Sequence, residues 1–224
     1  MTATERRLPP AMMHAGTGLT VIAALLACRA SPRSRCGEGT QSSSSAPEAG
    51  IVSPVIELVE RVDDQDRVLG VVSRDDAIRH GWLHRVAATV CRDERGRFLV
   101  SRRAAGLSRF PGYHEVSFGG AVTVGESYQA AARRELEEEL GVSVPVHEMV
   151  KFLCHGQIGS YWLGVHEAVI TGDVVPDPRA MSWVGWMTRA ELDEAMQRRR
   201  FVPDGQEALR RYLKAHETSS GSRA

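Results

Sequence analysis

Short apolar runs, some continuous and some alternating with polar residues, recur along the chain after residue 51, and this spacing predicts β-strands. Two pairs of these runs are separated by short polar segments, 63–66 and 93–96, and each pair predicts a β-hairpin. A later run is interrupted by Gly119 and Gly120 and predicts a broken strand. The strands predicted in this way are 55–62, 67–73, 84–92, 97–103, 115–123, 149–155, 160–170 and 183–187.

Other segments are rich in helix-forming residues and predict four helices. A short helix is predicted after Ser73, whose side chain can cap it, and extends to about His80. Longer helices are predicted at 127–140, 189–199 and 204–216. Because strands lie on both sides of a central helix and helices end the chain, the pattern predicts one α/β (α+β) domain with a mixed sheet packed by helices.

The first fifty residues differ from the rest. Arg6 and Arg7 precede a short apolar run, 19–27, which is followed by Cys28 and is too short to span a bilayer. This shape is typical of a weak secretory or lipoprotein signal, which would export the chain or anchor it to lipid through Cys28. The alternative, which we favour, is a disordered extension, because the polar stretch 29–50 cannot bury enough apolar surface to fold.

Domain organisation follows from this contrast. We expect a disordered extension at 1–50, a folded domain at 51–218 and a disordered tail at 219–224, in a protein located in the cytoplasm. The 224 residues include 28 basic and 28 acidic ones, so net charge indicates neither a nucleic-acid polymer nor a membrane surface as partner. The four cysteines show no metal-ligand spacing, and Cys91 and Cys154 lie in apolar runs that predict buried free thiols.

One stretch of the predicted central helix, RELEEELG, concentrates acid in a chain without net charge. Glu135, Glu138 and Glu139 are spaced so that their carboxylates share one helix face, while Leu136 and Leu140 lie on the apolar stripe beside it. No lysine follows to relieve the repulsion. A hard divalent cation such as Mg²⁺ would do so. From the helix alone, a metal site and a solvated face remain alternatives.

The loop before the helix favours the metal site. Gly120 can bring backbone close to a ligand, and Glu126 adds acid just before the helix. Together, residues 120–142 match the Nudix box at every fixed position: Gly120, five residues, Glu126, seven residues, then Arg134-Glu135-Leu136-x-Glu138-Glu139-x-Gly141-Val142. The chain therefore resembles the Nudix hydrolases, and the resemblance extends over most of residues 55–215.

This resemblance implies an α/β/α sandwich around a mixed sheet, with the box as a loop–helix–loop. Nudix enzymes cleave a diphosphate linked to another moiety, usually a nucleoside, with Mg²⁺ or Mn²⁺. Carried over by position, the implied metal ligands are Gly120, Glu126, Glu135, Glu138 and Glu139. The implied catalytic residues are Glu135, Glu138 and Arg134, the last of which would orient the carboxylates.

The wider sequence is similar to the Nudix subgroup that includes type 1 isopentenyl-diphosphate isomerases. In register with Phe110-Pro111-Gly112, the positions of the isomerase cysteine and of one metal histidine fall on Gly119 and Ala121, so both groups are missing. His84 matches another metal histidine of the isomerases, but a strand-end or core histidine is the simpler interpretation.

Four residues near the box are candidates for substrate binding: Arg102, Arg103, His114 and Glu115. Many relatives also place an acid before the late tryptophan strand, but 178–186 contains none, so Asp177, Glu167 or the box itself would have to supply the base. Trp162, Trp183 and Trp186 are expected in the core, with base stacking as the alternative for one of them.

The sequence thus predicts a Mg²⁺-dependent hydrolase, with Mn²⁺ as an alternative, that cleaves a nucleoside diphosphate derivative or a related small diphosphate. A catalytically silent Nudix module that senses a ligand or binds a protein is the second hypothesis, and an isomerase-like enzyme is the third. A homodimer is an expectation by analogy with relatives alone.

Overall fold

The computed structural model describes residues 56–221, so the predictions for residues 1–50, including Cys28, lie outside the described residues. The first predicted hairpin is confirmed: β1 (Leu58–Val62) and β2 (Val68–Ser73) pair antiparallel in a two-stranded sheet. Helix α1 (Arg74–His80) follows directly and is capped by the side chain of Ser73, as predicted.

A seven-stranded mixed sheet forms the rest of the described fold. Its strands are β3 (Arg85–Asp93), β4 (Phe98–Arg103), β5 (His114–Glu115), β6 (Phe118–Ala121), β7 (His147–Gly156), β8 (Gly159–Ile170) and β9 (Met181–Met187). Strand β3 is parallel to β8, whereas β8 with β7, β3 with β6, and β4 with β5 and β9 pair antiparallel. The predicted mixed sheet is therefore confirmed.

Strands β3 and β4 pair only at Arg92 and Phe98, next to their turn. Away from that turn each strand takes another partner: β3 pairs with β6, and β4 pairs with β5. The chain between residues 114 and 121 must therefore change partner. For this reason the single strand predicted at 115–123 is wrong and is replaced by β5 and β6.

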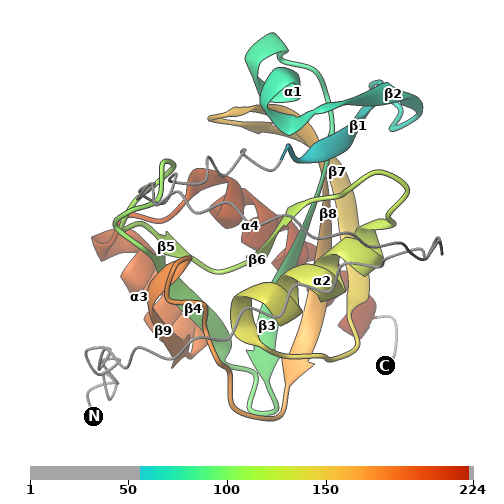
Figure 1. Ribbon diagram of the computed structural model, residues 1–224. Helices are drawn as coiled ribbons and strands as arrows, with labels where there is room; N and C mark the ends of the chain where they lie inside the picture. The colour runs from blue at the N-terminus through green and yellow to red at the C-terminus, as the bar shows by residue number, and fades with distance from the viewer. Residues whose placement is uncertain (1–55, 222–224) are drawn as a thin grey trace, which may run out of the picture. The chain divides into compact units, whose positions relative to one another are not determined.

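Helices cover both faces of the sheet (Figure 1). Helix α2 (Tyr128–Leu140) lies on one face, while α3 (Arg189–Arg198) and α4 (Pro203–Gly221) lie on the other. Residues of β3 alternate between the two layers: Ala87 packs in the core under α2, and Ala88 packs in the core under α4. This is the predicted α/β/α arrangement.

The two cysteines and the end of the chain can also be compared with the predictions. Cys91 and Cys154 are buried free thiols, as predicted. Helix α4 continues to Gly221, into the segment predicted as a tail from residue 219, because a helix once started adds each residue at little cost. In the described part of the chain, no helix combines the length and apolarity that crossing a membrane requires.

Candidate active site

The acidic stretch lies on α2, which has clear start and stop signals. The side chain of Ser127 accepts a hydrogen bond from the amide of Ala130, and Gly141 ends the helix in the left-handed conformation. Leu136 and Leu140 are buried against the sheet. This packing fixes the rotation of the helix and directs the neighbouring glutamate face toward β6.

Arg134 connects the helix to the loop before it. Its Nε donates to Oε1 of Glu126 at 3.0 Å, and its Nη2 donates to the carbonyl oxygen of Ala121 at 3.0 Å. Its Nη1 donates to Oε1 of Glu135 at 2.7 Å and lies 3.5 Å from Oε2 of Glu138. Arg134 therefore holds the two ends of the box together and orients the carboxylates.

Glu126 is fully engaged in this arrangement. Its Oε2 accepts hydrogen bonds from the amide and the hydroxyl of Thr123, both at 3.0 Å, in addition to the bonds from Arg134. Burial opposes its ionisation, but these bonds outweigh burial and hold the pKa of Glu126 below its usual value. Glu126 thus carries a stable negative charge at the start of the helix.

Gly120 lies directly against Glu135. A Cβ at this position would overlap the Glu135 carboxylate, so glycine is the residue that lets the carboxylate approach the β6 backbone. A Cβ at Gly119 would overlap the carbonyl oxygen of Ala87, so a cysteine there, as in the isomerases, would require the backbone to move. The box glycines therefore serve close packing of backbone, carboxylate and sheet.

At three nearby carboxyl groups, burial outweighs the hydrogen bonds and charges that favour ionisation. Burial raises the pKa of Glu139 to about 8, and the charges of Glu115 and Glu135 add to the effect. Burial also raises the pKa of Glu135, although the hydrogen bond and the charge of Arg134 oppose the shift. The pKa of Glu115 is raised by burial as well, although Arg103 opposes the shift. Negative charge at this position is unfavourable unless a cation joins it.

These groups fit a divalent cation that completes its shell with other ligands. Within residues 56–221, no three acidic, histidine or cysteine side chains already form a group that could hold a metal ion alone. One reason is that Glu135 is bonded to Arg134 and the Glu138 side chain is 59% exposed. Mg²⁺ needs only one or two carboxylates, since it keeps water and binds substrate phosphates. Carboxylates with raised pKa values beside Gly120 suit that kind of binding.

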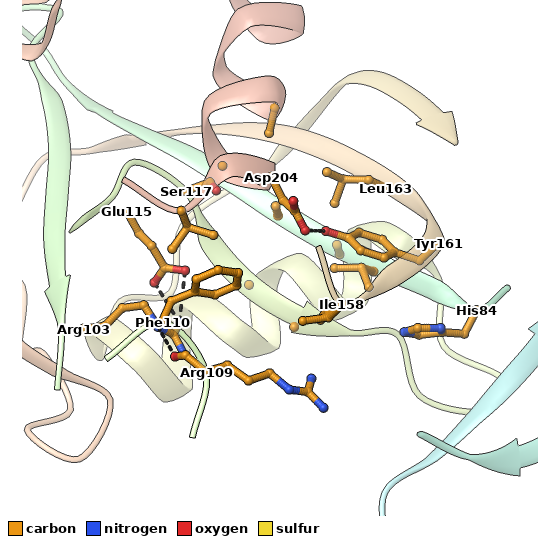
Figure 2. A pocket seen from close by; sticks show the side chains of 18 of the residues that line it. His84, Arg103, Arg109, Phe110, Glu115, Ser117, Ile158, Tyr161, Leu163 and Asp204 are labelled. Atoms are coloured by element: carbon orange, nitrogen blue, oxygen red, sulfur yellow. Dashed lines mark hydrogen bonds and ion pairs between the residues drawn. The ribbon is translucent and has the colours of Figure 1, made fainter. Parts of the chain in front are cut away.

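A cavity of about 160 Å³ lies where β3 and β4 separate, and Gly119 and Gly120 form part of its lining (Figure 2). Arg103 and Glu115 line it as an ion pair in which Nη1 donates to both carboxylate oxygens at 3.0 Å. Because Gly120 also contacts Glu135, the cavity adjoins the acidic face of α2 through β6.

Only half of the predicted substrate residues line the cavity. Arg103 and Glu115 do, but Arg102 and His114 do not. Side chains alternate between the faces of a strand, so one residue of each consecutive pair must point away. Arg102 donates to Ser182, and the His114 ring packs near Trp183 and Phe201. Of the four candidates, Arg103 and Glu115 thus lie where a ligand in the cavity could meet them, and Arg102 and His114 lie outside its lining.

Asp177 and Glu167, the two candidates to replace the acid missing from 178–186, lie outside the cavity lining. Asp177 is bound by Arg179, and Glu167 accepts a hydrogen bond from Tyr212. Neither lines the cavity. Glu115, which the sequence indicated only as a substrate contact, lines the cavity, and its charge acts on Glu139.

The tryptophans and His84 can also be placed. None of Trp162, Trp183 and Trp186 lines the cavity, and Trp183 and Trp186 pack against the two cores, as expected by default. His84 is 3% exposed and lines the cavity just before β3, and burial lowers its pKa. It is therefore a buried neutral residue of the cavity wall.

Sequence reasoning missed most of the cavity lining, including four residues with distinctive positions: Arg109, Phe110, Tyr161 and Asp204. Phe110 has a φ of 48°, unusual for a residue other than glycine, in the loop that carries Arg109. The Phe-Pro-Gly stretch was a signal for this loop. Tyr161 and Asp204 lie far apart in sequence, and no pattern connects them.

Comparison with known proteins identifies the family that shares this fold. A family model for the NUDIX domain matches residues 82–212. The uncharacterized Nudix hydrolase SCO1686 of Streptomyces coelicolor is 40% identical over 175 residues, which cover 77% of this chain and 96% of that protein. The uncharacterized Nudix hydrolase PA4841 of Pseudomonas aeruginosa is 32% identical over 160 residues, covering 71% and 95%.

Solved structures give the same result. The crystal structure of DR0079 from Deinococcus radiodurans aligns with a TM-score of 0.61 at 29% identity, covering 70% of this chain and 99% of that one. The chain belongs to the Nudix family. It is a hydrolase that acts on diphosphate bonds, in a family whose members generally use divalent metal ions.

Proposed function

We propose that the protein is a Mg²⁺-dependent hydrolase, with Mn²⁺ as an alternative cation, that cleaves a nucleoside diphosphate derivative or a related small diphosphate. The observation that carries this proposal is the pair of carboxyl groups on Glu135 and Glu139, whose pKa values are raised by burial. Both belong to the intact box, and Glu135 lies against Gly120 at the edge of the cavity.

Glu135, Glu138 and Glu139 would hold the cation, with Glu126 and the backbone of Gly120 completing the protein ligands. When bound, the cation neutralises the diphosphate and lowers the pKa of a water molecule. Arg134 keeps Glu135 in place through its 2.7 Å bond. Arg103 offers positive charge at the cavity wall for phosphate oxygens.

The proton acceptor is proposed to belong to the box, because neither Asp177 nor Glu167 lines the cavity. Glu138 is the best placed of the box glutamates for this role. Its side chain is exposed and its single contact with Arg134 is long, at 3.5 Å, so its oxygens are open to water. A cytoplasmic location and a homodimer stay predictions.

The test compares two substitutions one residue apart on α2. The full chain with Mg²⁺ is offered a panel of nucleoside and sugar diphosphates, and release of phosphate or monophosphate is measured. Glu138→Gln should abolish turnover, whereas Glu137→Gln, at the variable position of the box, should leave it within about twofold of the wild type. An unaltered rate in Glu138→Gln contradicts the proposal. Inactivity of the wild type on the whole panel would favour the ligand-sensing module.

A further inference from the structure

We propose that Asp204 and Tyr161, at the side of the cavity away from Arg103 and Glu115, select substrates whose organic group donates a hydrogen bond. Such a group carries an amine or a hydroxyl, and an apolar alkyl group would be rejected. This inference rests on the proposed hydrolase function and specifies the substrate class of the same site.

Tyr161 and Asp204 form a hydrogen-bonded pair in the cavity wall. Tyr161 donates from its hydroxyl to Oδ2 of Asp204 at 2.6 Å. Tyr161 is 6% exposed, and burial together with this bond raises its pKa, so the phenol stays protonated and remains a donor. A Cβ at Gly156 would overlap the same oxygen, so glycine there makes room for the carboxylate. One oxygen of Asp204 is therefore held by Tyr161.

The second oxygen is available. Within residues 56–221, Oδ1 of Asp204 has no hydrogen-bond or ion-pair partner, although Asp204 lines the cavity. The apolar side chains of Ile158 and Leu163 lie beside this pair in the cavity wall (Figure 2). A carboxylate oxygen in such a wall needs a donor, because a polar group left without one after water is displaced costs binding energy. A bound alkyl group would supply none.

Charge sets which end of the substrate meets Asp204. Figure 2 shows the Arg103–Glu115 and Tyr161–Asp204 pairs on different sides of the cavity. Arg109 also lines the cavity, and among the described residues its guanidinium has no hydrogen bond or ion pair. Phosphates are attracted to these arginines and to the cation site, whereas the Asp204 carboxylate repels them. The organic group is thus the part directed to Asp204.

Size limits what that group can be. The cavity of about 160 Å³ is smaller than the roughly 300 Å³ at which pockets for drug-sized ligands begin. It admits one small ring or a short chain. A sugar hydroxyl or the amine of a base placed there can reach Oδ1 of Asp204, and discrimination between substrates then depends on one hydrogen bond.

The experiment measures kcat and KM of the full chain with Mg²⁺ on matched diphosphates, 5-hydroxypentyl against pentyl, together with a panel of nucleoside and sugar diphosphates. The wild type should prefer the hydroxylated compound by about tenfold or more in kcat/KM, because a site built to bind a hydroxyl discriminates strongly against its absence. Asp204→Ala should remove that preference. It should also raise the KM of the best panel substrate about tenfold while kcat changes less than about threefold.

Two further variants separate selection from structural support. Asp204→Asn keeps an oxygen for Tyr161 but presents an amide donor to the cavity, so it should lose the preference without a large change in melting temperature. Asp193→Asn makes the same chemical change on α3, outside the cavity lining, and should match the wild type. A purely structural role would lower the melting temperature of Asp204→Asn and leave the preference intact.

The inference is overturned if the wild type shows no preference, or if Asp204→Ala keeps both the preference and the wild-type KM. A wild type that hydrolyses only alkyl diphosphates would overturn the inference while leaving the proposed function standing. If the wild type hydrolyses nothing, the proposed function fails. In that case, calorimetry compares the binding of adenosine diphosphate by the wild type and by Asp204→Ala. Binding at least tenfold weaker in the variant supports the inference, and equal binding overturns it.

Discussion

Within residues 56–221, the acids at the β1–β2 hairpin and on α2 are both buried, but their surroundings shift their pKa values in opposite directions. At the β1–β2 hairpin, Asp66 accepts bonds from Arg85 and Lys151 at 2.6 Å each and from Tyr128 at 3.1 Å. Burial opposes its ionisation, but these partners outweigh burial and hold the pKa of Asp66 below its usual value. On α2, burial raises the pKa of Glu139 to about 8.

This difference distinguishes carboxylates that support the fold from carboxylates that are suited to bind a cation. The Asp66 cluster supplies its own cations and joins the hairpin to the main sheet, since Arg85 also bonds Glu60, whose other oxygen accepts from the amide of Gly125 within the box. The α2 face supplies too few cations for its own carboxylates. A buried acid that its protein leaves uncompensated indicates an external cation, and a compensated one indicates a support.

The largest expected effect comes from Glu139→Gln. Because the amide cannot hold a cation as a carboxylate does, turnover should fall on the order of a thousandfold, corresponding to several kcal/mol of lost stabilisation. The melting temperature should not fall, since the variant removes a buried acid whose ionisation the fold resists. Turnover on the best diphosphate measures the loss of activity, and calorimetry measures the melting temperature. A large loss of stability with normal turnover would reverse the roles of the two regions.

Asp66→Asn is the matched change at the hairpin. It should lower the free energy of unfolding by about 2 kcal/mol, because Arg85 and Lys151 lose their common partner in a partly buried place. Asp66 has a φ of 62°, which asparagine tolerates well, so the backbone does not confound the result. Denaturant titration measures the loss. Unchanged stability would show that the compensated cluster supports nothing.

Gly120→Ala tests the contact between β6 and the acidic face. The new Cβ would displace the Glu135 carboxylate, so turnover should fall about tenfold or more for a misplaced ligand. Gly172→Ala is the control, because nothing lies within 4 Å of a Cβ at that position. Equal turnover in both variants would show that the position of Glu135 has no effect on the reaction.

The smallest effect is a dependence of stability on pH. The pKa of Glu139 rises from an ordinary 4.5 to about 8 in the cation-free fold. The protonated group therefore contributes its stability fully below about pH 4.5, and the contribution is lost as pH rises through about 8. Without cation, the wild type should lose more stability over this range than Glu139→Gln, because the amide does not titrate. Identical slopes in denaturant titrations would contradict this.

Local patterns in the sequence predicted much of the fold. The hairpins, α2 and the alternation of β3 follow from apolar periodicity and from caps such as Ser73 and Gly141. The break between β5 and β6 could not be predicted, because it depends on where β3 and β4 separate, which is a property of the whole sheet. Sequence spacing cannot report a change of strand partner.

The site also contains residues that the sequence indicated and residues that it could not indicate. The box residues were found because fixed spacing on one helix brings them together. Arg102 could not be distinguished from Arg103, since strand register decides which of them faces the cavity. The pairing of Tyr161 with Asp204 joins β8 to α4 across 43 residues and left no sequence signal.

The central claim is that the uncompensated carboxylates of α2 bind a divalent cation and the compensated cluster does not. Titration of the cation-free full chain with Mn²⁺, following free Mn²⁺ by electron paramagnetic resonance, tests this most directly. We predict one saturable site in the wild type and in Asp66→Asn, and its loss in Glu139→Gln. Undiminished binding by Glu139→Gln, or loss of binding in Asp66→Asn alone, would contradict the account.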